Sequence, residues 1–138
     1  MTLPDEGLIE LSLEGCDLTE LPKWVYYLRL SGLYLSSNKF KSIPTELSYF
    51  NDLKELDMSD NQIAYISDEI REMDQLFALS IDDNQIRDLP ESLVSLPAIK
   101  WLSCSGNRIS KVPVLDAISH SLKTLNMSYN NIREFSSI

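Results

Sequence analysis

The sequence contains very few of the side chains from which catalytic and metal sites are built. It has one histidine and two cysteines among 138 residues, and neither a C-x-x-C nor an H-E-x-x-H motif occurs. With four glycines it also lacks the glycine-rich loop that cradles a phosphate group. Catalysis needs a positioned nucleophile and base, or a metal held by several ligands. We therefore expect no enzymatic activity, no cofactor and no metal site.

Long hydrophobic runs are missing as well. No apolar segment approaches the roughly 18 residues that a membrane span needs. The N-terminus has neither the basic stretch nor the apolar segment of a secretory signal. The two cysteines, Cys16 and Cys104, fall in sequence repeats four units apart, well beyond the ~7 Å between Cα atoms that a disulfide can bridge. Free thiols are typical of a reducing compartment, so the sequence predicts a cytoplasmic protein.

Positive charge is scarce too. The chain has 12 basic and 21 acidic residues, which gives a net charge of -9. Such a charge repels nucleic acid and anionic membranes and favours basic partners. We therefore expect neither nucleic acid nor a membrane among the ligands. The length fits one domain, which we place over residues 1–138.

One pattern, L-x-x-L-x-L-x-x-N/C-x-L, occurs six times at intervals of 22 or 23 residues. The copies start at Leu8, Leu30, Leu53, Leu76, Ile99 and Leu122, and the last copy is incomplete. The polar landmark of the pattern is occupied by Cys16, Asn38, Asn61, Asn84, Asn107 and Asn130. Six copies in phase indicate a protein built by stacking one structural unit.

The pattern resembles that of the leucine-rich repeat proteins, specifically the intracellular class with about 23 residues per repeat and the tail L-P-x-x-L-x-x-L. The resemblance covers Leu8 to Ile138. Four copies carry the proline tail, as Leu21-Pro22, Ile43-Pro44, Leu89-Pro90 and Val112-Pro113. The third copy has Ile66-Ser67 instead, the sixth has Phe135-Ser136, and the fifth places Leu115 and Ile118 one residue early. Proteins of this class commonly serve as scaffolds in intracellular signalling, which is what the resemblance implies for function.

The residues themselves explain the fold that the resemblance implies. Alternation in segments such as Leu56-Asp57-Met58 predicts a short strand with one buried face. Such a strand is stable only when successive units stack, so we expect an α/β fold: a right-handed solenoid of six repeats with a parallel concave β-sheet and short 3₁₀ or α turns on the convex side. The landmark asparagines should satisfy the inward-facing turn backbone, and we expect Cys16 to be buried at the equivalent place.

The concave sheet is the natural binding surface of a solenoid. Its exposed positions are the third, fifth, seventh and eighth residues of each repeat. These 24 positions hold seven carboxylates (Glu10, Glu14, Glu55, Asp57, Asp60, Asp82 and Asp83) and no lysine or arginine. Tyr34, Trp101 and Tyr129 occupy the same surface, and large aromatic side chains often anchor interfaces. We predict a partner-binding face made of Glu10, Tyr34, Glu55, Asp57, Asp60, Asp82, Asp83, Trp101 and Tyr129.

The function that follows is a protein-protein interaction module, or scaffold, that binds a basic protein or peptide on its acidic concave face. A second interpretation of these acidic residues stays open: instead of binding a partner, they could serve solubility and protect the strands from pairing with other chains. An alternative function is the recognition domain of a larger signalling enzyme whose catalytic part is absent from this chain. The chain is expected to be a monomer or a segment of a longer protein, and end-to-end assembly of copies is the third hypothesis.

Overall fold

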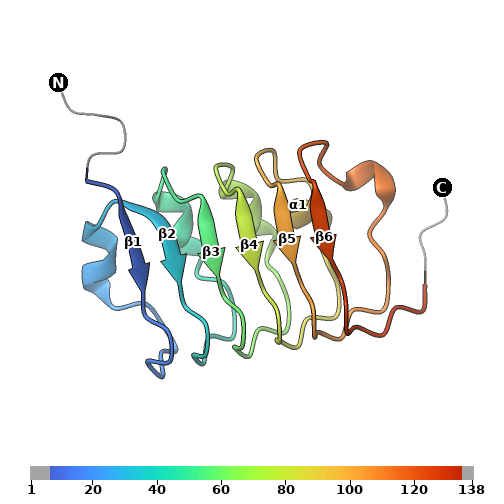
Figure 1. Cartoon of the computed structure of the whole chain (residues 1–138), viewed down its shortest axis with the longest axis horizontal. Helices are drawn as coiled ribbons and strands as arrows, with labels where there is room; N and C mark the ends of the chain where they lie inside the picture. Colours follow the sequence, from blue (N-terminus) through green and yellow to red (C-terminus); the bar gives the residue numbers. More distant parts are fainter. Residues whose placement is uncertain (1–6, 135–138) are drawn as a thin grey trace.

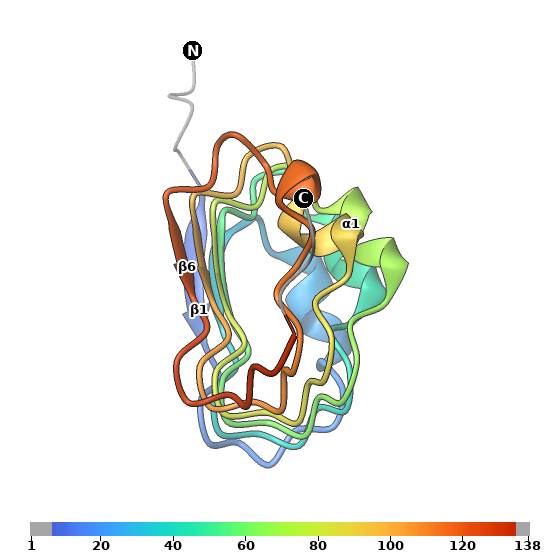
Figure 2. The ribbon, with the colours of Figure 1, turned by 90° about the vertical axis from the view of Figure 1, so that its right-hand side faces the viewer.

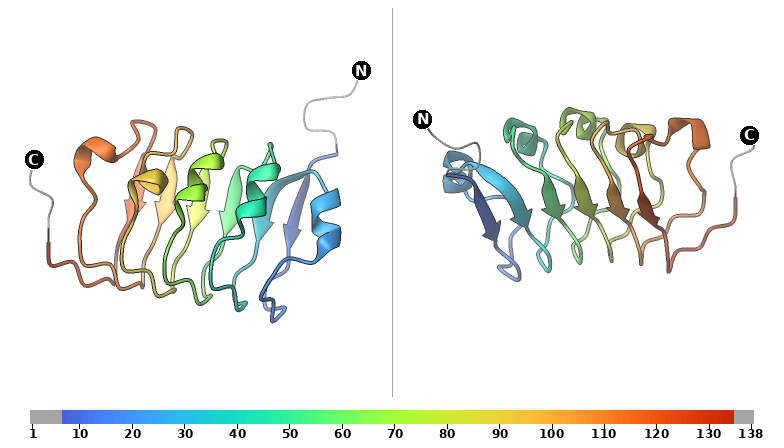
Figure 3. Two further views of the ribbon diagram at one scale, coloured as in Figure 1. Left: turned by 180° about the vertical axis from the view of Figure 1, so that it is seen from behind. Right: turned by 45° about the horizontal axis from the view of Figure 1, so that its top comes forward.

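The computed structural model describes residues 7–134 as one solenoid of stacked coils (Figure 1). Every coil begins with a short strand, and all of these strands lie side by side in one sheet. The strands are β1 (Ile9–Ser12), β2 (Leu30–Tyr34), β3 (Glu55–Asp57), β4 (Ala78–Ser80), β5 (Trp101–Ser103) and β6 (Thr124–Asn126). They follow one another in sequence order, and each pair of neighbours is parallel. The chain winds as a right-handed coil, as expected (Figures 1 and 3).

Short helical turns cover the side opposite the sheet (Figures 2 and 3). They are η1 (Lys23–Tyr27), η2 (Thr45–Tyr49), η3 (Asp68–Glu72), α1 (Glu91–Val94) and η4 (Leu115–Ala117), of which only α1 is an α-helix. Pro22, Pro44 and Pro90 are the N-cap residues of η1, η2 and α1. Ser67 replaces proline before η3, and there its hydroxyl accepts a hydrogen bond from the backbone N–H of Glu69. The turn of the fifth coil is the shortest, with three residues, in agreement with its irregular sequence.

The core lies between the sheet and the turns and runs through the whole stack. One cluster of buried apolar side chains extends from Leu21 to Ile109, and each of the strands β2 to β5 contributes a buried leucine to it: Leu33, Leu56, Leu79 and Leu102. The coils at the two ends contribute half-buried residues such as Leu11 and Leu125. Because every coil buries its apolar face against its neighbours, no coil has a core of its own. Within residues 7–134, no helix has the length and apolar character needed to cross a membrane.

The landmark asparagines form a ladder of hydrogen bonds between successive coils, which confirms their predicted structural role. Asn84 is a representative member. Its side-chain amide donates to the carbonyl oxygens of Met58, Ile81 and Asp82 at 3.0–3.1 Å, and its oxygen accepts from the N–H of Ile63 at 2.9 Å. Asn61, Asn107 and Asn130 repeat the same pattern one coil away each time. The side-chain amide groups of these residues therefore bond both their own coil and the preceding one, through the nitrogen as donor and the oxygen as acceptor.

Cys16 does not take the place of an asparagine in this ladder, and our expectation that it is buried is wrong. Its side chain is exposed, and the thiol contacts only the carbonyl oxygen of Glu14, at 3.6 Å. The physical reason is its position: no coil precedes the first one among the described residues, so the thiol has no preceding turn to pack against. The backbone N–H of Cys16 is instead bound by Asn38 of the next coil, at 3.1 Å. Cys104 is buried, and both thiols are free, as expected.

A left-handed backbone conformation recurs at the eighth position of every repeat, just before the ladder residue. The φ angles there lie between +52° and +68°, at Gly15, Ser37, Asp60, Asp83, Gly106 and Tyr129. Glycine adopts this conformation freely, and aspartate and asparagine tolerate it better than most residues. Asp60 and Asp83 therefore have a conformational reason for their positions in addition to any role of their charge. Tyrosine has no such tolerance of a positive φ, so the backbone conformation does not explain Tyr129.

Replacing Tyr129 by asparagine is expected to stabilise the protein. Its φ is +54° and its side chain is 87% exposed, so the substitution relieves backbone strain and gives up little buried surface. We expect the free energy of unfolding to rise by about 0.5–1 kcal/mol. Urea denaturation of the Tyr129→Asn variant measures this. Tyr27→Asn is the matched control, because Tyr27 is 90% exposed and has no positive φ; an equal gain in that variant would contradict the explanation.

Candidate functional site

The outward side of the sheet carries its side chains in straight rows. The third positions align as Glu10, Gly32, Glu55, Ala78, Trp101 and Thr124, and the fifth positions as Ser12, Tyr34, Asp57, Ser80, Ser103 and Asn126. We call the third, fifth, seventh and eighth positions of all coils the sheet face. Its seven carboxylates are exposed or half-buried, and none points into the core.

A groove of about 360 Å³ crosses the middle of the sheet face. Its walls include two aromatic side chains, Tyr34 from β2 and Trp101 from β5, while Ala78 and Ser80 of β4 supply small side chains between them. Five of the nine predicted site residues line this groove, namely Tyr34, Glu55, Asp57, Asp82 and Trp101. The structure thus brings the two central aromatic residues and three of the acids to one place.

Tyr34 is held in position by its acidic neighbours. Its hydroxyl donates a hydrogen bond of 2.6 Å to Oε2 of Glu55 on the next strand. The ring and the Glu10 side chain both lie over Gly32, where an added Cβ would stand 3.0 Å from the Tyr34 hydroxyl oxygen and 3.3 Å from Cγ of Glu10. The bond to Glu55, followed by desolvation, raises the pKa of Tyr34 to about 12. Tyr34 therefore remains a neutral donor under ordinary conditions, and its ring has a fixed place at one end of the groove.

Asp57 and Asp82 each use one carboxylate oxygen inside the sheet. Oδ1 of Asp57 accepts from the N–H and the hydroxyl of Ser59 at 2.9 and 2.6 Å. Oδ1 of Asp82 accepts from the Ser103 hydroxyl at 2.6 Å and from the N–H of Ser105 at 2.7 Å. In the last coil, Oδ1 of Asn126 accepts the equivalent two bonds, from the N–H and the hydroxyl of Ser128. Because the neutral Asn126 accepts the same bonds as Asp57, they do not explain why Asp57 is charged.

The remaining predicted site residues lie outside the groove. Asp60 and Asp83 occupy left-handed turn positions at the ends of their strands: Asp60 accepts from the Ser37 hydroxyl at 2.8 Å, and the carboxylate of Asp83 lies over Gly106. Tyr129 occupies the same turn of the last coil, and Glu10 lies beside Tyr34 on the first strand. These four residues belong to the sheet face but do not line the groove.

No carboxylate of the sheet face forms an ion pair within residues 7–134. The ion pairs in this part of the chain join Arg29 to Asp52, Lys39 to Asp17 and Arg71 to Asp68, all at other positions of the coils. The charge of the sheet face is therefore not neutralised by the chain's own described cations. Like charges on neighbouring strands repel one another, so an external cation bound there would be stabilised.

The chemistry available in the described chain is limited. Burial, and then the charge of Asp82, raise the pKa of the Cys104 thiol to about 12, and its Sγ donates to the carbonyl oxygen of Asn126 at 3.2 Å. A thiol in that state is a weak nucleophile. His120 is exposed in a turn. No group of three or more histidine, cysteine, aspartate or glutamate side chains within residues 7–134 is placed to hold a metal ion.

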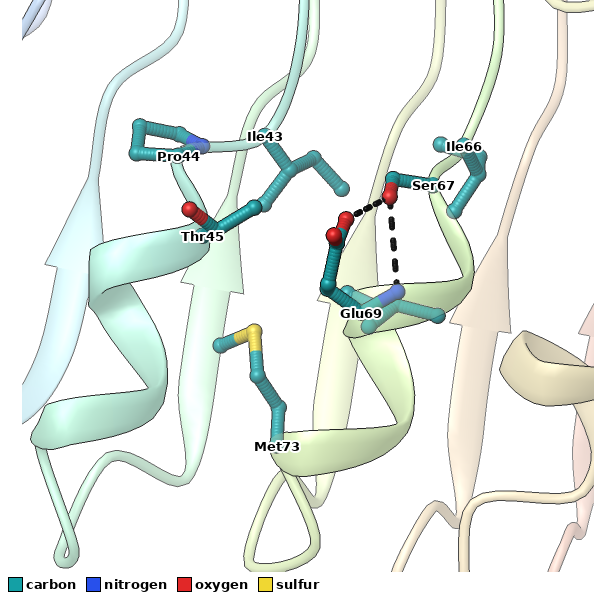
Figure 4. Close-up of a pocket in the computed structure, with 8 residues that line it drawn as sticks. Ile43, Pro44, Thr45, Ile66, Ser67, Glu69 and Met73 are labelled. Atoms are coloured by element: carbon teal, nitrogen blue, oxygen red, sulfur yellow. Dashed lines mark hydrogen bonds between the residues drawn. The ribbon is translucent and has the colours of Figure 1, made fainter.

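A second concavity lies on the convex side, between η2 and η3 (Figure 4). Ile43, Ile66, Ile70 and Met73 supply most of its apolar surface, and Ser67 and Glu69 are bonded to each other at its edge. Its volume of about 10 Å³ is close to the minimum that holds one water molecule. It is a packing gap between two successive turns and is too small for a ligand.

A parallel sheet on one side, short turns on the other and an asparagine ladder between coils define a solenoid repeat protein with an open sheet face. The family model described as "Leucine rich repeat" matches residues 28–86, and "Leucine Rich repeats (2 copies)" matches residues 97–138. The chain belongs to the leucine-rich repeat family. Members of this family are typically non-enzymatic modules for protein-protein interaction.

Solved structures share this fold. A leucine-rich repeat protein of Leptospira interrogans is 28% identical, with a TM-score of 0.75 over 88% of this chain and 31% of its own. The leucine-rich repeat domain of APL1B is 22% identical, with a TM-score of 0.75 over 88% of this chain and 38% of its own. An internalin C2 from Listeria monocytogenes is 23% identical, with a TM-score of 0.70 over 86% of this chain and 51% of its own. The chain thus spans 31% to 51% of the length of these structures. No curated protein sequence matches it.

Proposed function

We propose that the chain is a non-catalytic binding module, working in the cytoplasm as a scaffold, whose sheet face forms the concave docking surface for a basic protein or peptide. The observation that carries this proposal is the groove between Tyr34 and Trp101, which is lined by three carboxylates without an ion-pair partner in the described chain. An arginine side chain fits these features best. Its planar guanidinium can stack on an aromatic ring and pair with a carboxylate at the same time.

The hydrogen bonds inside the groove leave room for such a ligand. Asp57 and Asp82 use only Oδ1 in bonds with serine residues, so Oδ2 of each is left to accept from a guanidinium. Trp101 is 39% exposed, and its neighbours in the row are the small residues Ala78 and Thr124. The bonds at Oδ1 hold the carboxylates in place before the partner arrives, which lowers the entropy cost of binding.

Binding of a labelled arginine-rich peptide to two triple variants tests the proposal. Glu55→Gln, Asp57→Asn and Asp82→Asn together remove three charges from the groove. Glu46→Gln, Glu72→Gln and Glu91→Gln remove three charges from the convex turns and serve as the matched control. We expect the groove variant to bind at least about tenfold more weakly and the control to bind nearly as well as the native chain. Equal losses in both variants would show that only net charge matters.

A further inference from the structure

We propose that the chain has a second binding surface of opposite charge, a groove on the last three coils in which Arg87, Arg108 and Arg133 bind an acidic peptide segment through its carboxylates. The groove has a volume of about 560 Å³ and shares no residue with the groove of the sheet face. Its lining residues belong to the segments that follow β4, β5 and β6, in which the chain turns away from the sheet; these segments run along the lower edge of the solenoid in Figure 1. We call it the arginine groove.

The arginine groove stands out because charge is divided unevenly along the stack. Residues 7–75 hold 13 acidic and six basic residues, whereas residues 76–134 hold six of each. On this edge of the molecule the first coil carries Asp17 and Glu20, and the second coil carries Lys41 and also Lys39, which pairs with Asp17. A cationic cluster in a chain of net charge -9 is not explained by solubility.

The backbone holds the three arginine-bearing segments in register. The N–H of Arg108 donates to the carbonyl oxygen of Ile86 at 2.8 Å, and the N–H of Arg133 donates to that of Ser110 at 2.7 Å. With its amide oxygen turned toward Arg133, Asn131 accepts from Nη2 and Nε of that guanidinium at 2.9 and 3.2 Å. Successive coils therefore present one arginine each to a common groove on a rigid frame.

These arginines have no carboxylate partner within the part of the chain that the structure describes. The ion pairs found there involve Arg29, Lys39 and Arg71, and none involves Arg87, Arg108 or Arg133. Glu134 lines the same groove, yet it forms no ion pair with them. The guanidinium groups of Arg87 and Arg108 are thus available to an incoming carboxylate, which they can bind in a bidentate manner, whereas that of Arg133 already donates to Asn131 through Nε and Nη2.

A peptide carboxylate fits this surface better than a more highly charged anion. Nucleic acid and phosphorylated segments carry a denser negative charge, which Glu134 inside the groove and the acidic coils beside it would repel more strongly. A segment with a few glutamates or aspartates offers planar groups that match arginine at a smaller repulsive cost. The expected partner is therefore a short acidic stretch of another protein.

Fluorescence anisotropy of a short labelled peptide of alternating glutamate and serine tests this inference on the full chain. We expect binding that weakens as salt is added, that falls at least about tenfold in the triple variant Arg87→Gln, Arg108→Gln, Arg133→Gln, and that strengthens in Glu134→Gln. The matched control is Lys54→Gln, Lys100→Gln, Lys123→Gln, which removes the same charge from the second positions of coils 3, 5 and 6 and should leave the affinity within about twofold.

Four results would overturn the inference: no binding of the glutamate peptide, equal losses in the two triple variants, no gain in Glu134→Gln, or tighter binding of a phosphoserine peptide or an oligonucleotide than of the glutamate peptide. The groove variant Glu55→Gln, Asp57→Asn, Asp82→Asn separates this inference from the proposed function. It should lose the arginine-rich peptide and keep the glutamate peptide. Loss of both ligands in that variant would contradict the independence of the two surfaces.

Discussion

Asn84→Ala is expected to lower the free energy of unfolding by about 3 kcal/mol, the largest loss of stability that we expect from any single ladder substitution. The Asn84 amide makes four hydrogen bonds and is only 7% exposed. Removing it leaves the buried N–H of Ile63 without its side-chain partner, and it takes away one of the two amides that donate to the carbonyl oxygen of Met58, the other being Asn61. Each buried polar group that loses its partner costs about 1–3 kcal/mol.

Urea denaturation followed by circular dichroism measures this loss. Gln85→Ala is the control, because Gln85 is the next residue, is exposed, and should change the stability by less than about 0.5 kcal/mol. Comparison of m-values shows whether the coils still unfold together, since a lower m would indicate that the stack has split at the substituted coil. A loss in Asn84→Ala no larger than in Gln85→Ala would contradict the role given to the ladder.

Trp101→Ala is expected to weaken binding of the arginine-rich peptide by roughly tenfold or more while changing stability by less than about 1 kcal/mol. Trp101 is 39% exposed and its neighbours in the row are small, so little of the core depends on it. Trp101 is the largest side chain that lines the groove with Asp57 and Asp82. Titration calorimetry together with urea denaturation separates the two effects.

Tyr49→Ala is the matched control for this prediction. Tyr49 is a 77% exposed aromatic residue at the end of η2, on the side opposite the sheet. Its removal should leave peptide binding unchanged. If Trp101→Ala lost stability and affinity to the same degree, the ring would be a packing residue, and the interpretation of Trp101 as an anchor would be wrong.

The repeat pattern was sufficient to predict the fold. Six copies of one motif predicted the strands, their parallel order and the asparagine ladder, because each feature follows from the need of one coil to bury its apolar side against the next. The strands begin one residue earlier than Leu56 or Leu79 would suggest, at Glu55 and Ala78. Periodicity identifies the buried residue of a strand but does not fix where its hydrogen bonds begin.

The details of the site could be predicted only in part. The register placed Tyr34, Asp57 and Trp101 on one face, but hydrogen bonds such as that from Ser103 to Asp82 depend on side-chain geometry that alternation does not specify. The left-handed turn at Asp60 could have been predicted from the sequence. Glycine stands at the same position in the first and fifth repeats, and it favours a positive φ. The arginine groove was missed because its residues occupy different repeat positions, Arg87 and Arg133 the twelfth and Arg108 the tenth.

Chemical-shift mapping of the isotopically labelled chain titrated with the arginine-rich peptide tests the central claim most directly. If the sheet face is the docking surface, the largest chemical-shift changes will be those of the amides of residues 55–57, 78–82 and 101–105. The amide chemical shifts of the convex turns η2 and η3 will not change. Changes concentrated in the convex turns, or spread evenly over both sides, would contradict the account.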